Sequence, residues 1–454
     1  MALATVNPFN GEHVKSLDGS AASEIDVALA GAAGSAPTWA ATTFARRAAL
    51  MRNVSAILRG RSELWARLIT LEMGKIIREA RAEVEKCAVT SEFYAEHAER
   101  FLADEKIQSD AGLSYVAYFP LGTVLAVMPW NFPFWQVFRF AAPALMAGNT
   151  VVLKHASNVP QCSLAIEAIF REAGFPEGVF RSLLIPGEQV QALIADPRIH
   201  AVSVTGSEAT GRKIAAAAGA ALKKTVLELG GSDAFVVLAD ADLELAASVG
   251  VAARYLNGGQ SCIAAKRFIL VESVADRFLE LFRRRAGDLK QGDPSDEDTH
   301  IGPMARADLR DELDRQVQDS IRMGAVPVMG CGPVAGPGFF YRISILDHVQ
   351  PGMPAYEEEL FGPVAIVIRA ADEDDALRIA NDSRYGLGGS IWTRDTGKGE
   401  HMARRLQSGT AFVNGMVKSD ARLPFGGIKA SGYGRELSYL GIREFVNAKT
   451  VWIK

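Results

Sequence analysis

A single cysteine within a glycine-rich stretch is the residue of this sequence best suited to covalent chemistry. Cys262 lies in the run Asn-Gly-Gly-Gln-Ser-Cys-Ile-Ala at 257–264, and glycine lets a backbone turn sharply or approach a ligand closely. A thiol is a strong nucleophile only as the thiolate, so a catalytic cysteine must be accessible and its charge must be stabilised. The alternative is a buried apolar residue, which is the commoner role of a free cysteine. Cys87, Cys162 and Cys331 fit that alternative, because each lies in or beside an apolar or helical pattern.

A lone carboxylate stands upstream of this stretch at a second glycine turn. Glu228 comes near the end of the strand-like alternating segment 224–229 and is followed by Gly230 and Gly231. A thiol that attacks a substrate and a carboxylate that activates water would together divide the work of covalent catalysis. The pairing of Cys262 with Glu228 is therefore a hypothesis, weak on these two residues alone.

Composition limits the remaining functions. The chain has 454 residues, enough for two or three domains with real cores. Its net charge of −4 provides no basic surface for nucleic acid or for an anionic membrane. Four widely spaced cysteines indicate a reducing compartment, without disulfides and without a metal site. With no signal sequence and no apolar run long enough to span a membrane, we expect a cytoplasmic protein.

The first hundred residues have the pattern of helices. Apolar residues recur at three- and four-residue spacing through 45–60, 62–74 and 75–100. The charged residues on the other faces are interpreted as solvated surface; they are Arg78, Glu79, Glu83, Glu85 and Lys86. A polar run at 104–112 leads into 113–119, which alternates and is rich in aromatic residues. We expect 113–119 to be an exposed strand or hairpin outside the main core that could pair with another subunit.

The segment 123–238 alternates between strand-like and helical patterns. Such alternation predicts βαβ units and a doubly wound parallel sheet, which binds ligands at the carboxyl ends of its strands. At one of these ends, Thr205, Gly206 and Ser207 leave a strand and open an alanine-rich helix. Backbone N–H groups there could bind a phosphate. Taken alone, this turn is better explained by Ser207 as an ordinary helix N-cap.

A second α/β region follows from about residue 240 onward. Helices are predicted at 242–257, 274–289, 306–323 and 373–381, and strands at 267–271, near 326 and 343, and at 364–368. Three adjacent acids at 357–359 interrupt the region and could simply form a solvated loop.

Several ordered motifs resemble the aldehyde dehydrogenase superfamily over essentially the whole chain. They are Pro-Trp-Asn-Phe-Pro at 129–133, Leu-Lys at 153–154, Thr-Gly-Ser at 205–207, Glu-Leu-Gly-Gly at 228–231, Gly-Gln-Ser-Cys at 259–262, Glu-Leu-Phe-Gly-Pro at 359–363, and Pro-Phe-Gly-Gly-Ile-Lys at 424–429 with Ser-Gly at 431–432. The closest resemblance within the superfamily is to the shorter, bacterial-type, NADP-linked succinate-semialdehyde dehydrogenases. The resemblance implies a dinucleotide-binding domain at 1–104 and 121–228, a catalytic domain at 229–436, and oligomerisation strands at 105–120 and 437–454.

The same resemblance implies catalytic roles for three residues. Cys262 would add to an aldehyde to form a hemithioacetal, which loses hydride to the cofactor and becomes a thioester. The side-chain amide of Asn131 and the backbone N–H of Cys262 would form the oxyanion hole. Glu228 would activate the water that releases the free acid.

Cofactor positions follow from the motifs in the same way. Trp130 and Ser207 would lie near the pyrophosphate, Lys154 on the adenosine ribose, and Glu359 on the nicotinamide ribose, with Phe361 beside it. Thr205, Gly206 and Leu229 would be further cofactor-binding residues. NAD-preferring members commonly carry an acid three positions after the lysine, where this sequence has Ser157. Because Ser157 and Lys154 would accept a 2′-phosphate that a carboxylate would repel, we expect NADP, with NAD as the alternative.

The expected substrate is succinate semialdehyde. Trp135 and Arg139 are four residues apart and so share one helix face, and Arg139 is surrounded in sequence by aromatic residues. It is either a paired structural cation or a clamp for a substrate carboxylate, the role that its position matches in succinate-semialdehyde dehydrogenases. Ser419 could be its partner, and Ser261 precedes the thiol.

Three other functions stay open at this stage. The enzyme could oxidise another small carboxylated or aliphatic aldehyde. A cysteine hydrolase would need a histidine base, for which His155, in place of the usual proline after Lys154, is the candidate. A non-catalytic protein could retain the fold, as crystallin-like members of the superfamily do. We expect a homodimer or a homotetramer.

Overall fold

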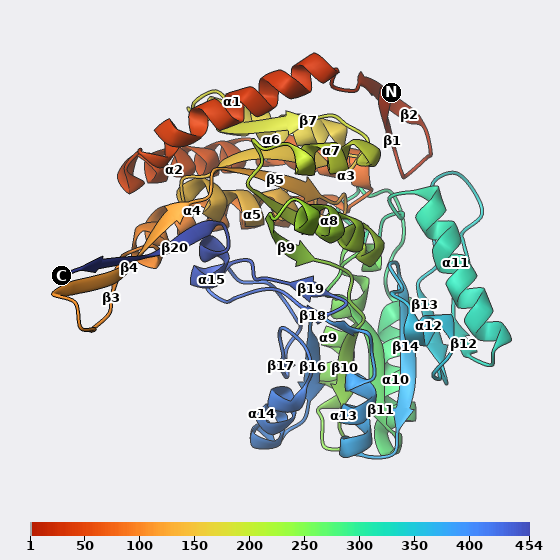
Figure 1. Cartoon of the computed structure of the whole chain (residues 1–454). Coiled ribbons are helices and arrows are strands. Elements are labelled where there is room, and N and C mark those ends of the chain that lie inside the picture. Colours follow the sequence, from red (N-terminus) through yellow and green to blue (C-terminus); the bar gives the residue numbers. More distant parts are fainter. Residues whose placement is uncertain (1) are drawn as a thin grey trace.

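Six strands form the first of two large sheets in the computed structural model, which describes residues 2–454 (Figure 1). Their order is β19-β9-β8-β5-β6-β7. The strands are β5 (Thr123–Met128), β6 (Thr150–His155), β7 (Phe180–Leu183), β8 (Ala201–Thr205), β9 (Lys224–Glu228) and β19 (Gly432–Tyr433). All pairs are parallel except the β19–β9 pair, which is antiparallel. β5 and β6 are buried along their whole length because helices cover both faces.

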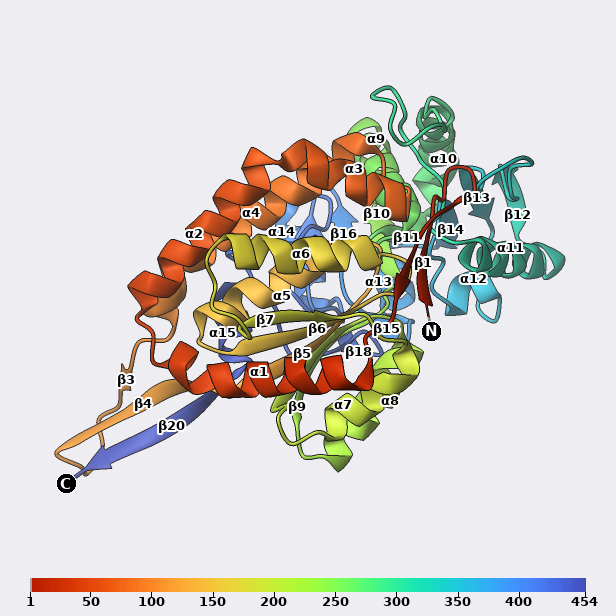
Figure 2. The same cartoon turned by 90° about the horizontal axis from the view of Figure 1, so that it is seen from above.

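Helices cover both faces of this sheet (Figure 2). One face packs against α1 (Ala22–Ala40), α7 (Val190–Ala195) and α8 (Glu208–Ala220). The other face packs against α2 (Phe44–Gly60), α3 (Ser62–Met73), α4 (Ile77–Phe101), α5 (Trp135–Met146) and α6 (Pro160–Glu172). The expected doubly wound parallel sheet is thereby confirmed.

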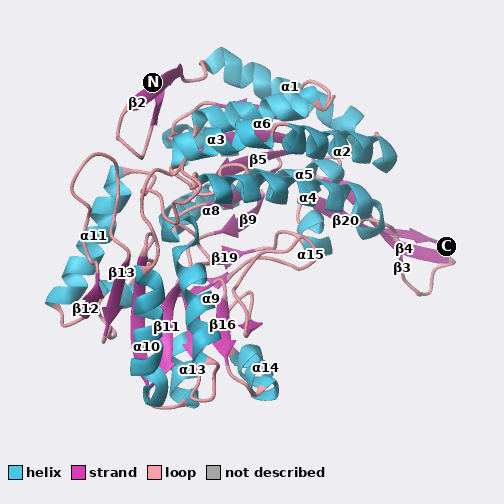
Figure 3. Cartoon of the chain, turned by 180° about the vertical axis from the view of Figure 1, so that it is seen from behind, coloured by secondary structure: helices cyan, strands magenta, loops and turns pink. Residues whose placement is uncertain are grey.

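Seven strands form the second sheet, in the order β12-β13-β14-β11-β10-β16-β17. They are β10 (Asp233–Val237), β11 (Ala265–Val271), β12 (Val326–Met329), β13 (Ser344–Asp347), β14 (Val364–Ala370), β16 (Gly389–Trp392) and β17 (Phe412–Val413). The helices around it are α9 (Leu243–Tyr255), α10 (Glu272–Gly287), α11 (Ala307–Arg322), α12 (Pro354–Glu357), α13 (Glu373–Asn381) and α14 (Thr396–Arg405) (Figure 3). The first sheet's β9 and the second sheet's β10 are joined by the Leu229–Ser232 turn, so Glu228 lies where the chain crosses from one sheet to the other.

A small antiparallel sheet projects from the body and carries the C-terminus (Figure 1). It contains β3 (Glu105–Lys106), β4 (Leu113–Pro120) and β20 (Val446–Ile453), with β4 at its centre. The segment 437–454 is not strand throughout, because α15 (Ser438–Arg443) precedes β20.

Two further antiparallel strand pairs were not foreseen. β1 (Ala2–Val6) pairs with β2 (His13–Asp18), and β15 (Tyr385–Gly386) pairs with β18 (Ile428–Lys429). Within residues 2–454, no helix is long and apolar enough to cross a membrane. The same residues hold no group of three or more histidine, cysteine or acidic side chains arranged to bind a metal ion.

Candidate active site

The loop that carries Cys262 is built on three consecutive residues in the left-handed region. Asn257, Gly258 and Gly259 have φ values of 56°, 61° and 73°, a conformation that favours glycine. A Cβ on Gly259 would also collide with the carbonyl oxygen of Gly362. This turn ends the helical segment after α9 and presents Cys262 just before β11.

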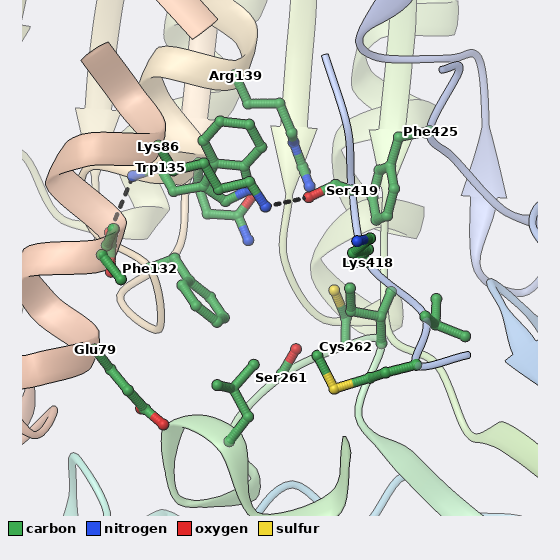
Figure 4. A pocket seen from close by; sticks show the side chains of 17 residues that line it. Glu79, Lys86, Phe132, Trp135, Arg139, Ser261, Cys262, Lys418, Ser419 and Phe425 are labelled. Atoms are coloured by element: carbon green, nitrogen blue, oxygen red, sulfur yellow. Dashed lines mark hydrogen bonds between the residues drawn. The ribbon is translucent and has the colours of Figure 1, made fainter. Parts of the chain in front are cut away.

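Cys262 is half-buried in a wall that two cavities share. The first cavity, of about 210 Å³, is shown in Figure 4 and is largely lined by α4, α5 and the loop around 416–419. The second, also about 210 Å³, lies toward the carboxyl ends of β5, β8 and β9. Among residues 2–454, only Cys262 and Gln136 line both. A thiol in this position can meet one ligand from each side.

Asn131 lies in the second cavity and is held by the cysteine loop. Its side-chain amide donates to the carbonyl of Gln260 over 3.1 Å, and the amide of Asn257 donates to the carbonyl of Asn131 over 2.8 Å. An amide nitrogen carries two donors, and only one is used within the part of the chain that the structure describes. The second N–H is free for a developing oxyanion, and the oxyanion role stays a prediction.

The thiol itself is protonated in this state. Burial raises the pKa of Cys262 to about 12, with Glu359 and Glu228 adding to the rise and Arg139 and Lys266 opposing it. The charge stabilisation expected for a reactive thiolate is therefore not provided by the protein alone. Of the other cysteines, Cys87 and Cys162 are buried as expected.

Glu228 is a buried carboxyl without a hydrogen-bond partner. It ends β9 with 2% exposure, and neither of its oxygens has a partner within residues 2–454. Burial, followed by the charge of Glu436, raises its pKa to about 8, while Arg139 and Arg435 oppose the rise. A carboxyl with this pKa can take up a proton near neutral pH, as a general base must.

The second cavity gathers most of the predicted cofactor residues. Its lining includes Trp130, Asn131, Thr205, Gly206, Ser207, Leu229, Glu359 and Phe361. Ser207 is the N-cap of α8, where its hydroxyl accepts from the backbone N–H of Thr210 over 3.3 Å. Ser207 can therefore cap α8 and line the second cavity at the same time.

Glu359 is not part of a solvated loop. Its carboxylate pairs with Lys266 at 3.2 Å and accepts from the backbone N–H of Gly231 over 3.0 Å. Lys266 also donates to the carbonyl oxygens of Ser261 and Cys262. The carboxylate that faces the second cavity is thus connected through one lysine to the cysteine loop.

Lys154 and Ser157 line a third, more open cavity of about 550 Å³. Lys154 is 8% exposed, and burial lowers its pKa, an effect that Glu188 opposes. Ser157 is exposed, and the neighbouring Asn158 has a buried Nδ2 with no partner within residues 2–454. Arg306, which precedes α11, lines the same cavity.

Trp135, Arg139, Ser261 and Ser419 all line the first cavity together with Cys262. Arg139 is 2% exposed and pairs with the buried Glu436. It also donates to Thr205 Oγ1 over 3.3 Å and lies 4.7 Å from the ring centroid of Phe425. These are the contacts of a paired structural cation, and its role as a substrate clamp stays a prediction.

Three charged residues of α4 were wrongly interpreted as solvated surface. Lys86, Glu79 and Glu83 line the first cavity, and the Oε1 of Glu83 accepts from the backbone N–H groups of Phe134 and Trp135. Burial raises the pKa of Glu79 to about 7, and its carboxylate accepts from the backbone N–H of Asn257. Positions 79, 83 and 86 are spaced by four and three residues, which places them on one helix face. The sequence therefore predicts that these three residues share a face of α4. It does not predict that α5 packs over that face.

His155 cannot serve as a base for Cys262 in this structure. Its Nδ1 accepts from the backbone N–H of Ala156 over 2.8 Å, so the N–H is on Nε2 and donates to the carbonyl of Pro133 over 2.8 Å. Burial lowers its pKa to about 4. The histidine that a cysteine hydrolase would need is therefore occupied elsewhere.

Comparison with known proteins gives a consistent result along the whole chain. Residues 1–451 match the model of the aldehyde dehydrogenase family. A probable succinate-semialdehyde dehydrogenase [NADP(+)] of Synechocystis sp. is 51% identical over 453 residues, covering 100% of both chains. The succinate-semialdehyde dehydrogenase [NADP(+)] of Mycobacterium avium is 48% identical, covering 100% of this chain and 97% of the relative. The crystal structure of succinic semialdehyde dehydrogenase from Streptococcus pyogenes, in complex with NADP+, superposes with a TM-score of 0.98 at 38% identity, covering 100% of both chains.

Proposed function

Because this chain belongs to the aldehyde dehydrogenase family, we propose that it oxidises succinate semialdehyde to succinate with NADP as the hydride acceptor. The observation that carries the proposal is the position of Cys262 between two cavities. One cavity holds cationic and hydroxyl side chains suited to a small carboxylated substrate, and the other holds the residues predicted to bind a dinucleotide. The full-length similarity to relatives named for this reaction supports it.

The residues around the third cavity fit a dinucleotide that carries a 2′-phosphate. Lys154 supplies a buried cation, Ser157 supplies a hydroxyl where a carboxylate would repel phosphate, and the unpartnered Nδ2 of Asn158 supplies a further donor. Thr205, Gly206 and Ser207 would hold the pyrophosphate at the start of α8. When bound, NADP supplies the acceptor for the hydride that leaves the substrate.

The chain's own residues carry out the remaining steps. The Cys262 thiol gives its proton to water and its sulfur adds to the aldehyde carbon, while the Asn131 amide and the Cys262 backbone N–H stabilise the oxygen that becomes negative. Loss of hydride from that carbon leaves a thioester on Cys262. Glu228 then takes a proton from water, the hydroxide adds to the thioester, and the C–S bond breaks to release succinate.

Initial rates of nicotinamide reduction test the proposal directly. Succinate semialdehyde and butyraldehyde, which has the same chain length and no carboxylate, are compared with NADP and with NAD. We expect the highest kcat/KM for succinate semialdehyde with NADP. Equal values for the two aldehydes would contradict the substrate, and no reduction with any pair would contradict catalysis.

We further propose that the chain forms a homodimer or a homotetramer through the projecting sheet of β3, β4 and β20. Four large apolar side chains on this sheet are at least two-fifths exposed; they are Leu113, Phe119, Trp452 and Ile453. β20 is an edge strand of this sheet, and exposed apolar residues on a projecting sheet with a free edge are suited to pairing with a second copy. Replacing Trp452 with lysine should lower the mass measured by light scattering. An unchanged mass would contradict this interface.

A further inference from the structure

A buried lysine lies behind the loop that presents the nucleophile. Lys266 is the second residue of β11 and is 1% exposed. Its ammonium group has three N–H donors, and these meet the carbonyl oxygens of Ser261 and Cys262, at 2.8 Å and 2.9 Å, and the carboxylate of Glu359, at 3.2 Å. Lys266 itself lines neither of the two cavities that share Cys262. It therefore acts on a bound ligand only through these neighbours.

The contact with Ser261 fixes the direction of the backbone N–H of Cys262. The carbonyl of Ser261 and the N–H of Cys262 belong to one peptide unit, which is planar and trans. In a trans peptide the C=O and N–H bonds point in opposite directions. Because Lys266 holds the carbonyl oxygen on its own side, the N–H points away from the lysine. That N–H has no acceptor within residues 2–454, so it is available to an oxygen of the substrate.

Neighbouring groups hold this arrangement in place before any substrate binds. The carbonyl oxygen of Cys262 packs against Gly231, where an added Cβ would lie 2.6 Å from it. The backbone N–H of Gly231 donates to the same Glu359 carboxylate that pairs with Lys266. Gly231 belongs to the turn that follows Glu228. Lys266 thus joins the loop of the nucleophile to the turn that carries the predicted base.

The positive charge of Lys266 strengthens the effect of its hydrogen bonds. Glu359 balances that charge, as a buried cation requires. A charged donor forms stronger hydrogen bonds than a neutral one, and a carbonyl that accepts such a bond makes the N–H of its own peptide unit a better donor. The charge also reaches the thiol: burial raises the pKa of Cys262 to about 12, and Arg139, followed by Lys266, opposes that rise.

We propose that Lys266 is a positioning residue for the oxyanion hole, which holds and polarises the Ser261–Cys262 peptide so that the N–H of Cys262 is directed at the oxygen that becomes negative. This inference rests on the proposed function and adds a residue that never touches the substrate. Because the oxygen carries its charge only after the thiol has added, Lys266 contributes to the rate of reaction and not to the binding of the aldehyde.

Two substitutions separate the hydrogen bonds of Lys266 from its charge. Lys266→Met keeps the length of the side chain and removes both, whereas Lys266→Gln removes the charge and keeps an N–H donor. The first readout is the single-turnover rate of NADP reduction at increasing concentrations of succinate semialdehyde. We expect the saturating rate of Lys266→Met to fall by about 30-fold or more, with a change of less than about threefold in the concentration that gives half of that rate. Lys266→Gln should lose less, because its amide can still donate to the carbonyl of Ser261.

Alkylation of Cys262 by iodoacetamide is a second readout, and it needs no turnover. Labelling is followed at Cys262 itself by mass spectrometry of the peptide. Both substitutions remove the positive charge, so both should slow alkylation at neutral pH by about tenfold, since one unit of rise in the thiol pKa lowers the thiolate fraction tenfold. Lys266→Gln should therefore match Lys266→Met in alkylation and exceed it in NADP reduction. A merely structural role of Lys266 would not separate the two readouts.

Arg267→Gln is the matched control, because it removes a buried cation from the next residue of the same strand. Arg267 is 2% exposed and donates to carbonyl oxygens outside the cysteine loop, those of Ser232, Ile379 and Ala380. Successive side chains of a strand point to opposite faces. The control should lower the unfolding midpoint in urea, as Lys266→Gln does, and change the alkylation of Cys262 by less than about threefold.

The outcomes separate this inference from the function on which it rests. Wild-type rates of NADP reduction and alkylation in the Lys266 variants that fold would overturn the role of Lys266 and leave the function standing. A loss of substrate affinity with an unchanged saturating rate would also overturn it, as would equal effects of Lys266→Gln and Arg267→Gln on alkylation. A wild-type protein that reduces NADP with no aldehyde would contradict the proposed function, and the oxyanion role with it.

Discussion

Replacing Arg139 with methionine distinguishes a structural cation from a substrate clamp. The guanidinium is 2% exposed and pairs with Glu436, which is 4% exposed. Arg139 is the cation that most lowers the pKa of Glu436, a carboxyl whose pKa burial otherwise raises. In Arg139→Met, Glu436 loses that compensation, and the pKa of its buried carboxyl rises further. The variant should therefore be less stable for a reason unrelated to substrate.

The size of the loss follows from the buried ion pair. Removing one partner of such a pair costs about 3–5 kcal/mol, because the other charge is left buried and uncompensated. Burial raises the pKa of Glu436 above the ordinary value of a glutamate, and Arg139 opposes that rise. Because a group whose folded pKa is raised loses stability as the pH rises above its unfolded pKa, the deficit should grow with pH.

Urea unfolding at pH 5, 6, 7 and 8 measures this deficit, and initial rates with both aldehydes accompany it. We expect the unfolding midpoint of Arg139→Met to fall progressively as pH rises, and both aldehydes to lose activity together. The double variant Arg139→Met with Glu436→Met should recover most of the stability, since no charge is left unpaired. A single variant of wild-type stability that loses only succinate semialdehyde affinity would refute this reasoning and make Arg139 the clamp.

Three other predictions concern the base, the cysteine loop and the cofactor. The rate of deacylation, measured after the burst of reduced cofactor, should increase with pH through about 8, because Glu228 must be deprotonated to activate water. In Glu436→Gln the increase should occur at lower pH, because the charge of Glu436 raises the pKa of Glu228. Identical pH profiles for the two proteins would show that Glu436 does not affect the base. Gly259→Ala should destabilise the protein by about 1–3 kcal/mol and abolish most activity, because its φ is 73° and the added Cβ has no space. Gly287→Ala, at a position with open surroundings, is the control, and equal unfolding midpoints for the two variants would contradict the steric argument. Ser157→Glu should lower kcat/KM for NADP about tenfold or more relative to NAD, because a carboxylate repels the 2′-phosphate; an unchanged ratio would show that this position does not read the phosphate.

The local patterns of the sequence were sufficient for most of the architecture. The alternation in 123–238 predicted the first sheet up to β9, and each strand there follows from neighbouring apolar residues. The glycines before Cys262 predicted a sharp turn, and three positive φ values form it. These strands and this turn depend on residues close together in the chain, so they can be predicted from the sequence before the tertiary structure is known.

The partners of buried charges could not be obtained in this way. Glu436 is separated from Arg139 by most of the chain and meets it only because the segment that contains β19 returns to β9. Lys86 belongs to a helix whose charged residues suggested a solvated face. In the structure, α5 and the loop that carries Ser419 pack over Lys86. The raised pKa values of Cys262 and Glu228 could not be predicted from the sequence either, because burial is their main cause.

The amino-acid sequence by itself determined the family resemblance, the order of the elements and the residue types available for chemistry. The tertiary structure alone decided which of those residues are desolvated and which charges neutralise one another. The physical reason is that helix and strand formation is set by nearby residues, whereas desolvation and ion pairing depend on which distant segments pack together.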